Sequence, residues 1–171
     1  MSGNFAFLKE RWELLANLGE MAERNVYMDP NTSLIKLRMF GETMTKYICA
    51  LEELEESREL THFDRLSQLQ RDGLLTDDIL DMLHAIRRAG NKAAHEANYG
   101  TTREALSLIR MAFRLGVWFM QVYGDWNFRE PDYVEPAESH QEQEGADNRT
   151  QLEMLAQSYE ARVQQLEQEL A

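Results

Sequence analysis

LHAIRRAGNKAAHE, residues 83–96, has the spacing of one helix with two different faces. A helix turns by about 100° per residue, so one face collects the small and apolar residues expected to pack: Leu83, Ile86, Gly90, Ala93 and Ala97. The opposite face carries polar residues at steps of four, three and four: His84, Arg88, Asn91 and His95. A solvated face is more often built from Glu and Lys. Imidazole, guanidinium and carboxamide groups instead suit phosphate binding and proton transfer.

The composition of the chain predicts a helical, cytoplasmic protein. Its 171 residues suffice for one domain with a core and an appendage, and only 9 are Gly and 3 are Pro. No apolar run is long enough to cross a membrane, and no secretion signal is recognisable. The single cysteine, Cys49, cannot form a disulfide within the chain, which suits a reducing compartment. We therefore expect no association with a membrane.

The charge is unevenly distributed along the chain. The net charge is −12, but residues 1–124 contribute only −3, from 15 Lys and Arg against 18 Asp and Glu. Residues 125–171 contribute −9. Within residues 84–115 the balance is +4, because Glu96 and Glu104 stand against six basic residues: Arg87, Arg88, Lys92, Arg103, Arg110 and Arg114. A locally basic surface is therefore compatible with an acidic protein.

Helical periodicity predicts five helices in residues 1–124. The first covers residues 5–25 with Asn4 as its N-cap, and the second runs from the Asp29-Pro30 start to about residue 57. The second has the broadest apolar stripe and is expected to be central. A third covers residues 61–73 with Thr61 as its N-cap, and has three expected contact residues: Phe63, Leu66 and Leu69.

Two further helices complete the predicted bundle. The helix of the opening stretch covers residues 76–98 and is ended by Asn98 and Gly100. The next begins at Thr101 or Thr102, is apolar over most of its surface, and ends at Tyr123. The fold class is therefore all-α, a compact bundle of about five helices followed by a coiled-coil-like helix.

The composition changes after Gly124. Residues 125–148 contain many acids and few aliphatic residues, which predicts an acidic linker. Its aromatic residues are expected to fold back onto the bundle: Trp126, Phe128 and Tyr133. From residue 149 to 171 the periodicity predicts a C-terminal helix, with an approximate heptad seam at Leu152, Leu155, Tyr159, Arg162 or Val163, and Leu166. This helix is either a weak coiled coil or the start of a longer one.

Arg88 and His95 are the candidate catalytic pair. A guanidinium binds the scissile phosphate of RNA through two parallel hydrogen bonds. An imidazole removes the proton of the 2′-hydroxyl, which then attacks the neighbouring phosphorus without a metal. The alternative is structural, since the same side chains could bind a neighbouring helix end or a dimer partner.

The other polar residues of the stretch are candidates for binding phosphate. This set extends onto the next helix and comprises His84, Arg87, Asn91, Lys92, Arg103, Arg110 and Arg114. His84 is either a second imidazole of the site or an ordinary surface histidine. Asn91 either orients His95, caps a facing loop, or marks a bend or close helix approach at Gly90. The arginines of the fifth helix either bind nucleic acid or form salt bridges with residues 52–59 or the acidic tail.

No metal or cofactor is expected. His84 and His95 are three turns apart, and no carboxylate accompanies them at the spacing of metal ligands. The sequence contains no phosphate-binding glycine loop and no nucleophile elbow.

Three separated motifs carry a family resemblance: Asn4–Leu8, Asp29–Arg38 and Ile86–His95. Arg88, six intervening residues and His95 resemble the R-x(4–6)-H motif of the HEPN superfamily of helical bundles, many of them metal-independent ribonucleases. The three motifs together resemble a domain of unknown function at the N-terminus of type I restriction endonuclease R-subunit-like proteins, over about residues 4–124. The resemblance implies a bundle that pairs through the motif helix. It also implies a following coiled coil and a nuclease and helicase motor elsewhere in the protein.

This resemblance leaves three functions open. The first is an N-terminal accessory domain of a restriction or phage-defence protein, which forms a homodimer, associates with RNA or DNA and meets other restriction subunits. The second is a metal-independent endoribonuclease that uses Arg88 and His95. The third is a structural dimer module. The residue after Arg88 is Ala89, whereas ribonuclease branches commonly carry a polar residue there.

Overall fold

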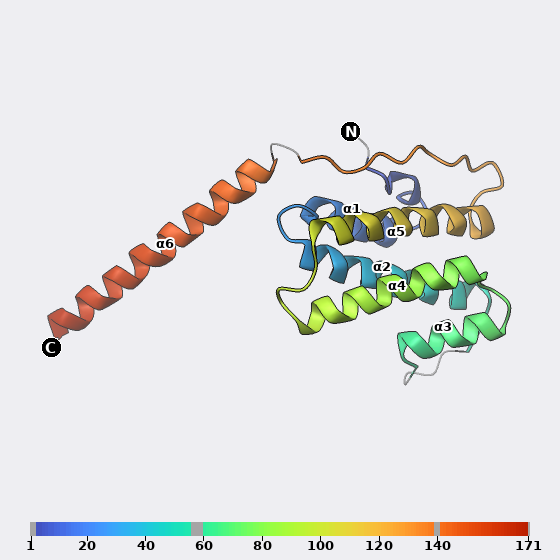
Figure 1. The fold of residues 1–171 in the computed structure, drawn as a ribbon, viewed down its shortest axis with the longest axis horizontal. Helices are drawn as coiled ribbons and strands as arrows, with labels where there is room; N and C mark the ends of the chain where they lie inside the picture. Colours follow the sequence, from blue (N-terminus) through green and yellow to red (C-terminus); the bar gives the residue numbers. More distant parts are fainter. Residues whose placement is uncertain (1–2, 56–59, 139–140, 171) are drawn as a thin grey trace. The chain divides into compact units, whose positions relative to one another are not determined.

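Helix α2, Pro30–Leu51, is the central element of the bundle. The computed structural model describes residues 3–55, 60–138 and 141–170. In it α2 contacts α1 (Glu13–Asn25), α3 (His62–Arg71), α4 (Asp77–His95) and α5 (Thr102–Tyr123). Figure 1 shows α1, α2, α4 and α5 running alongside one another, with α3 at one edge. The described residues contain no strand, so the all-α fold is confirmed.

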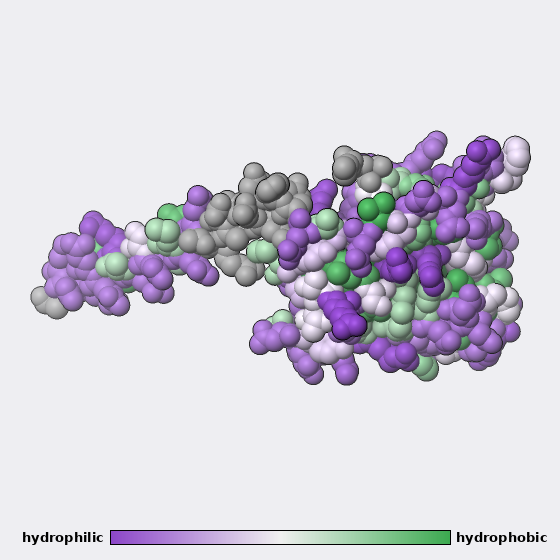
Figure 2. All heavy atoms as spheres, turned by 45° about the horizontal axis from the view of Figure 1, so that its top comes forward, coloured by the Kyte–Doolittle hydropathy of each residue, from purple (hydrophilic) through white to green (hydrophobic). Residues whose placement is uncertain are grey.

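The chain divides into two compact units, Met1–Pro136 and Ala137–Ala171. The second unit contains α6, Gln141–Leu170, which begins before the expected residue 149. Its described side chains are exposed, and apolar side chains occur among a mostly hydrophilic surface (Figure 2). The exposed apolar positions include Leu152, Leu155, Tyr159, Val163 and Leu166.

The capping residues of three helices were predicted correctly. Asp29 caps α2, accepting the Thr32 N–H at 3.1 Å, and Pro30 occupies the first turn. Thr61 forms a capping box with Asp64 at the start of α3. Thr101 caps α5 by accepting the Glu104 N–H. These bonds satisfy backbone donors that have no partner inside the helix.

The prediction of one helix over residues 5–25 was wrong. A short 3₁₀ helix, η1 (Ala6–Leu8), precedes α1, and Asn4 is not a cap. Asn4 instead donates to the Val134 carbonyl and accepts its N–H. The chain must turn back here because the Phe5 ring is fully buried against Gly19, where an added Cβ would overlap the ring.

α2 and α4 both end earlier than predicted. α2 stops at Leu51 because Glu53 adopts a left-handed backbone with φ of 54°, and the Leu54 N–H bonds the Cys49 carbonyl. Residue 57, its expected end, lies outside the described residues. α4 stops at His95, so Ala97 is exposed and does not belong to the packing face.

Asn31 explains the end of α4. Its side-chain Nδ2, which carries two hydrogens to donate, lies 2.9–3.0 Å from three backbone carbonyl oxygens at and beyond the helix end: Ala93, Glu96 and Tyr99. A carboxamide on α2 therefore satisfies carbonyls that the helix leaves open. This contact connects α2 to the turn that leads into α5.

The segment after α5 packs partly against the bundle. Tyr133 and Phe128 contact Phe113 and Phe7, with ring centroids 5.1 and 5.6 Å apart. The expectation for Trp126 was wrong, because its side chain is 98% exposed. The backbone turns at Asp125–Phe128, which leaves the indole outside.

α5 is long and apolar enough, by length and composition, to cross a membrane, and is the one such helix among the described residues. Yet 56% of its most apolar window is buried inside the bundle. Figure 2 shows a bundle face that is mostly hydrophilic, with smaller apolar areas between the polar ones. α5 therefore has the packing of a core helix.

Candidate nucleic-acid interface

The polar face of α4 lies opposite its packing face, as predicted. Leu83, Ile86, Gly90 and Ala93 are buried. Arg88 and His95 are exposed, whereas His84 and Asn91 are half-buried. No hydrogen bond or ion pair joins Arg88 or His95 to another described residue. These two side chains are therefore free to contact a ligand.

Arg88 lies at a cleft of about 620 Å³ between α4 and α5. Three basic side chains line the cleft: Arg88, Lys92 and Arg103. Ala85, Ala89 and Leu108 supply apolar surface, and the remaining lining residues are Tyr99, Thr101, Glu104 and Ser107. The cleft thus combines cations, hydroxyl groups and an apolar wall, which are the groups that bind a phosphate and the sugar or base beside it.

Glu104 is the carboxylate among the residues that line this cleft. It accepts a hydrogen bond from the Tyr99 hydroxyl at 3.0 Å, and this bond raises the pKa of Tyr99. The Lys92 ammonium lies 5.5 Å from the centre of the Tyr99 ring. Arg88 and Arg103 form no ion pair with Glu104 or with another carboxylate in the described part of the chain.

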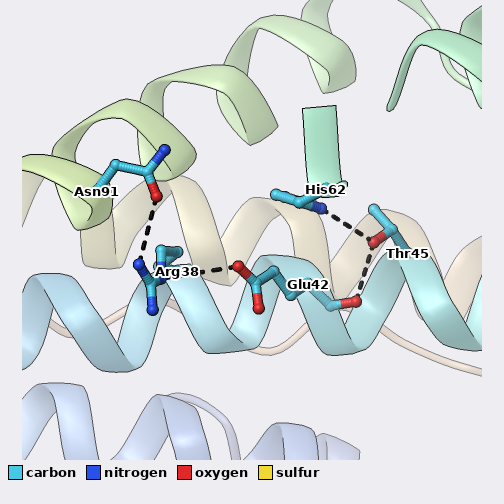
Figure 3. A network of polar contacts seen from close by, with 5 residues as sticks. All are labelled: Arg38, Glu42, Thr45, His62 and Asn91. Atoms are coloured by element: carbon cyan, nitrogen blue, oxygen red, sulfur yellow. Dashed lines mark hydrogen bonds and ion pairs between the residues drawn. The ribbon is translucent and has the colours of Figure 1, made fainter. Parts of the chain in front are cut away.

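Asn91 belongs to a polar network between α4 and α2 (Figure 3). Its Oδ1 accepts from Arg38 Nη1 at 3.3 Å, and Arg38 Nε lies 3.7 Å from Glu42. Gly90 makes this approach possible, because an added Cβ would overlap Arg38 Cβ and lie 2.9 Å from the Leu34 carbonyl oxygen. Of the alternatives for Gly90 and Asn91, close helix approach is the one observed.

His84 and Arg87 form a separate cluster with α3. Arg87 Nε donates to His84 Nδ1 at 3.4 Å, and the Arg87 guanidinium lies 5.2 Å from the centre of the Phe63 ring. Burial lowers the pKa of His84, and the charges of Arg87 and Arg88 lower it further. His84 is therefore held largely neutral near pH 7 and is a hydrogen-bonding group rather than a fixed charge.

His62, which sequence reasoning missed, is the first residue of α3 and faces α2. Its Nδ1 lies 3.5 Å from the Thr45 hydroxyl, and that hydroxyl donates to the Glu42 carbonyl (Figure 3). Burial lowers the pKa of His62 to about 4, with Arg65, Arg87, His84 and Arg38 adding to the effect. Arg38 was also missed. The sequence did contain a signal for Arg38. This charged residue stands one turn after the apolar residue Leu34 on α2, and the Gly90-Asn91 pair on α4 is typical of a close helix approach.

His95 is the last residue of α4 and lies away from the lining of the Arg88 cleft. His95 stands seven positions after Arg88, which is about 10 Å along the helix axis. Within one copy of the chain, the two side chains share a face but are not joined by a described contact.

Arg110 and Arg114 lie in a different region, facing the segment after α5. The Arg110 guanidinium is 5.1 Å from the centre of the Tyr133 ring. Both line a hollow of about 470 Å³ with acidic Glu130 and Asp132. They form no ion pair with a described carboxylate, and residues 56–59 of their expected partners lie outside the described residues. The three arginines of α5 therefore lie in two regions, and Arg103 is the one of the three that lies beside Arg88.

No group of three or more His, Cys, Asp or Glu side chains in the described ranges could hold a metal ion. The polar groups that the described residues place at this interface include cations, imidazoles and hydroxyl groups. These groups bind anions by charge-assisted hydrogen bonds.

Comparison with known proteins identifies relatives. The sequence model of a family described as "domain of unknown function (DUF4145)" matches residues 20–130. The chain is 37% identical over 134 residues to the type I restriction enzyme EcoKI endonuclease subunit of Escherichia coli (strain K12). That alignment covers 78% of this chain and 11% of that protein. No solved structure matches the chain. The chain is thus related to one part of a restriction endonuclease subunit.

Proposed function

Because this chain belongs to the DUF4145 family, we propose that it is an accessory domain of a type I restriction or phage-defence system. In this proposal it acts in the cytoplasm and meets other restriction subunits. It binds the phosphate backbone of nucleic acid in the cleft beside Arg88. The similarity to an endonuclease subunit supports the first part. The described residues of the interface support the second.

The observation that carries the proposal is the grouping of Arg88, Lys92 and Arg103 around one cleft. These residues come from α4 and α5, and the fold holds them at an accessible surface. A phosphate oxygen pair accepts two hydrogen bonds from one guanidinium. Because these contacts address phosphates rather than base edges, we expect binding with little dependence on base sequence.

The test is titration of fluorescein-labelled single- and double-stranded oligonucleotides with the whole chain at several salt concentrations. The triple variant Arg88→Gln, Lys92→Gln, Arg103→Gln should lose at least ten-fold in affinity. It should also lower the slope of log K against log salt by about 2, since each lost phosphate contact removes about 0.7–0.9. The matched control is Arg110→Gln, Arg114→Gln, which should bind as the wild type. Equal binding by the triple variant and the wild type refutes the cleft.

Pairing of two copies along α4 is part of the same proposal, as is membership of the HEPN superfamily. The exposed polar face of α4 supports the pairing of two copies, since that face is not covered by the described bundle. Two copies of Arg88 would meet near such an interface and repel each other, so an anion between them should favour pairing. Sedimentation equilibrium with and without an oligonucleotide tests this, and a monomer under both conditions would contradict it.

A second candidate function is metal-independent cleavage of RNA. The observation in its favour is that Arg88 and His95 are both exposed on one face and free of described hydrogen bonds. His95 would act as general base and Arg88 would bind the scissile phosphate. Cleavage of end-labelled RNA in chelator, with a 2′,3′-cyclic phosphate product that Arg88→Ala and His95→Ala abolish, would establish it. If the wild type is inert while oligonucleotides still bind, the accessory function remains.

A further inference from the structure

We propose that Phe63 is a base-stacking site for single-stranded nucleic acid, with Arg87 and His84 binding the adjoining backbone. This inference rests on the proposed function, because it adds a second contact surface to the same ligand. The proposed stacking site is formed by residues of α3 and α4 that do not line the Arg88 cleft. The chemistry recognised is an unpaired base next to a phosphate.

Phe63 is exposed, whereas the other two apolar residues of α3 are not. Leu66 and Leu69 are fully buried against the bundle, whereas the Phe63 side chain is 52% exposed. Sequence periodicity predicted all three as contact residues, and for Phe63 the prediction was only half right. A ring that is half exposed at the start of a capped helix gains little from burial, so it offers an aromatic surface to a ligand.

Two nitrogen-bearing side chains from α4 flank this ring. The Arg87 guanidinium lies 5.2 Å from the ring centre, and the centre of the His84 ring lies 5.8 Å away. Arg87 Nε also donates to His84 Nδ1, so the two are held in one arrangement. This combination of an aromatic surface and an adjacent guanidinium is typical of sites where one base stacks and its phosphate binds nearby.

Arg87 supplies the positive charge of this cluster for an anionic ligand. Its guanidinium forms no ion pair with a carboxylate in the described part of the chain. Asp81 lies close enough to His84 for its charge to raise the pKa of that imidazole, against the larger effect of burial, which lowers it. Asp64 accepts the Thr61 N–H within the capping box.

Arg87 and Arg88 are adjacent in the sequence but serve different surfaces. Arg87 faces α3 and Arg88 lines the cleft toward α5. The width of a helix is about 10 Å, which corresponds to about three nucleotides at the 3.4 Å spacing of a stacked strand. One single strand can therefore cross α4 and contact both surfaces. A duplex keeps its bases stacked inside and has no free base for Phe63.

The test compares fluorescein-labelled dT12, U12 and a 12-base-pair DNA duplex by anisotropy titration with the whole chain. Phe63→Leu keeps an apolar side chain but removes the aromatic face, and should weaken single-strand binding at least five-fold without changing the salt slope. Phe63→Trp should bind single strands as the wild type does. Arg87→Gln should lower the salt slope by about 0.7. Duplex binding should be the same in Phe63→Leu and wild type.

The control is Trp126→Leu, which removes an aromatic side chain that is 98% exposed but has no cation of this cluster beside it. It should leave all three affinities unchanged. Unchanged single-strand binding by Phe63→Leu, or an equal loss for single strands and duplex, overturns the stacking site. If the triple cleft variant still loses binding in that case, the proposed function stands. If Phe63→Leu weakens the binding of dT12 alone, the site prefers DNA, and if it weakens the binding of U12 alone, the site prefers RNA.

Discussion

The contact between α2 and α4 provides a prediction in which two glycines of one interface respond with opposite sign. Gly41 on α2 and Gly90 on α4 are both buried within helices. An added Cβ at Gly41 would lie 3.6 Å from Leu83 Cδ2 and 3.7 Å from Ile86 Cγ2, which is ordinary van der Waals contact. An added Cβ at Gly90 would overlap Arg38 Cβ on the facing helix.

The magnitudes follow from two effects. Replacing Gly by Ala inside a helix stabilises it by about 1 kcal/mol. At Gly41 nothing opposes this gain, so Gly41→Ala should raise the free energy of unfolding by about 0.5–1 kcal/mol. At Gly90 the overlap costs about 1–3 kcal/mol. The hydrogen bond from Arg38 to Asn91 is worth about 1 kcal/mol more. Gly90→Ala should therefore destabilise the bundle by about 1–3 kcal/mol.

Urea unfolding followed by tryptophan fluorescence measures both changes. Trp12 packs against Phe119 in the bundle, with ring centroids 4.9 Å apart, so the signal reports this unit rather than α6. The two midpoints should move in opposite directions from that of the wild type, with equal slopes. If Gly90→Ala is as stable as Gly41→Ala, the close approach of the two helices is refuted, and with it the explanation given for Gly90.

Three further outcomes are expected. Asn31→Asp should lower the unfolding free energy by about 2–4 kcal/mol, more than Asn31→Ala, because a carboxylate would replace a donor to three carbonyls; equal urea midpoints would contradict this. Thr101→Ala should cost about 1 kcal/mol and Thr76→Ala less, since the Thr76 side chain makes no capping hydrogen bond; thermal unfolding ranks them, and the reverse order is the contrary result. His62 has a folded pKa of about 4 against an ordinary 6.5, so the unfolded chain binds the extra proton. Stability should therefore be fully present above pH 6.5 and fall as the pH drops toward 4, by at most about 3 kcal/mol, whereas His62→Gln should reduce this slope between pH 7 and 5.

The sequence predicted features that local geometry decides. The capping residues at Asp29, Thr61 and Thr101 were correct because a cap needs only a side-chain oxygen near the first turn. The two faces of α4 were correct because the helical period alone assigns them. The centrality of α2 also followed from its broad apolar stripe.

The errors arose where distant segments meet. The break before α1 depends on Phe5 entering the core beside Gly19, and the end of α4 depends on Asn31 from another helix. No local signal in the sequence contains these partners. The exposure of Trp126 has the same origin, because an aromatic residue after a helix carries no information about which way the backbone turns.

The candidate site shows the same division. The sequence by itself determined that Arg88 and His95 share the polar face of α4, because the period of a helix fixes which side chains lie together along it. Only the tertiary structure decided which cations face the same space. It brought Arg103 beside Arg88, directed Arg110 toward Tyr133, and placed Phe63 against Arg87. Contacts between helices depend on crossing angles and side-chain volumes across the whole core, and no single helix encodes these.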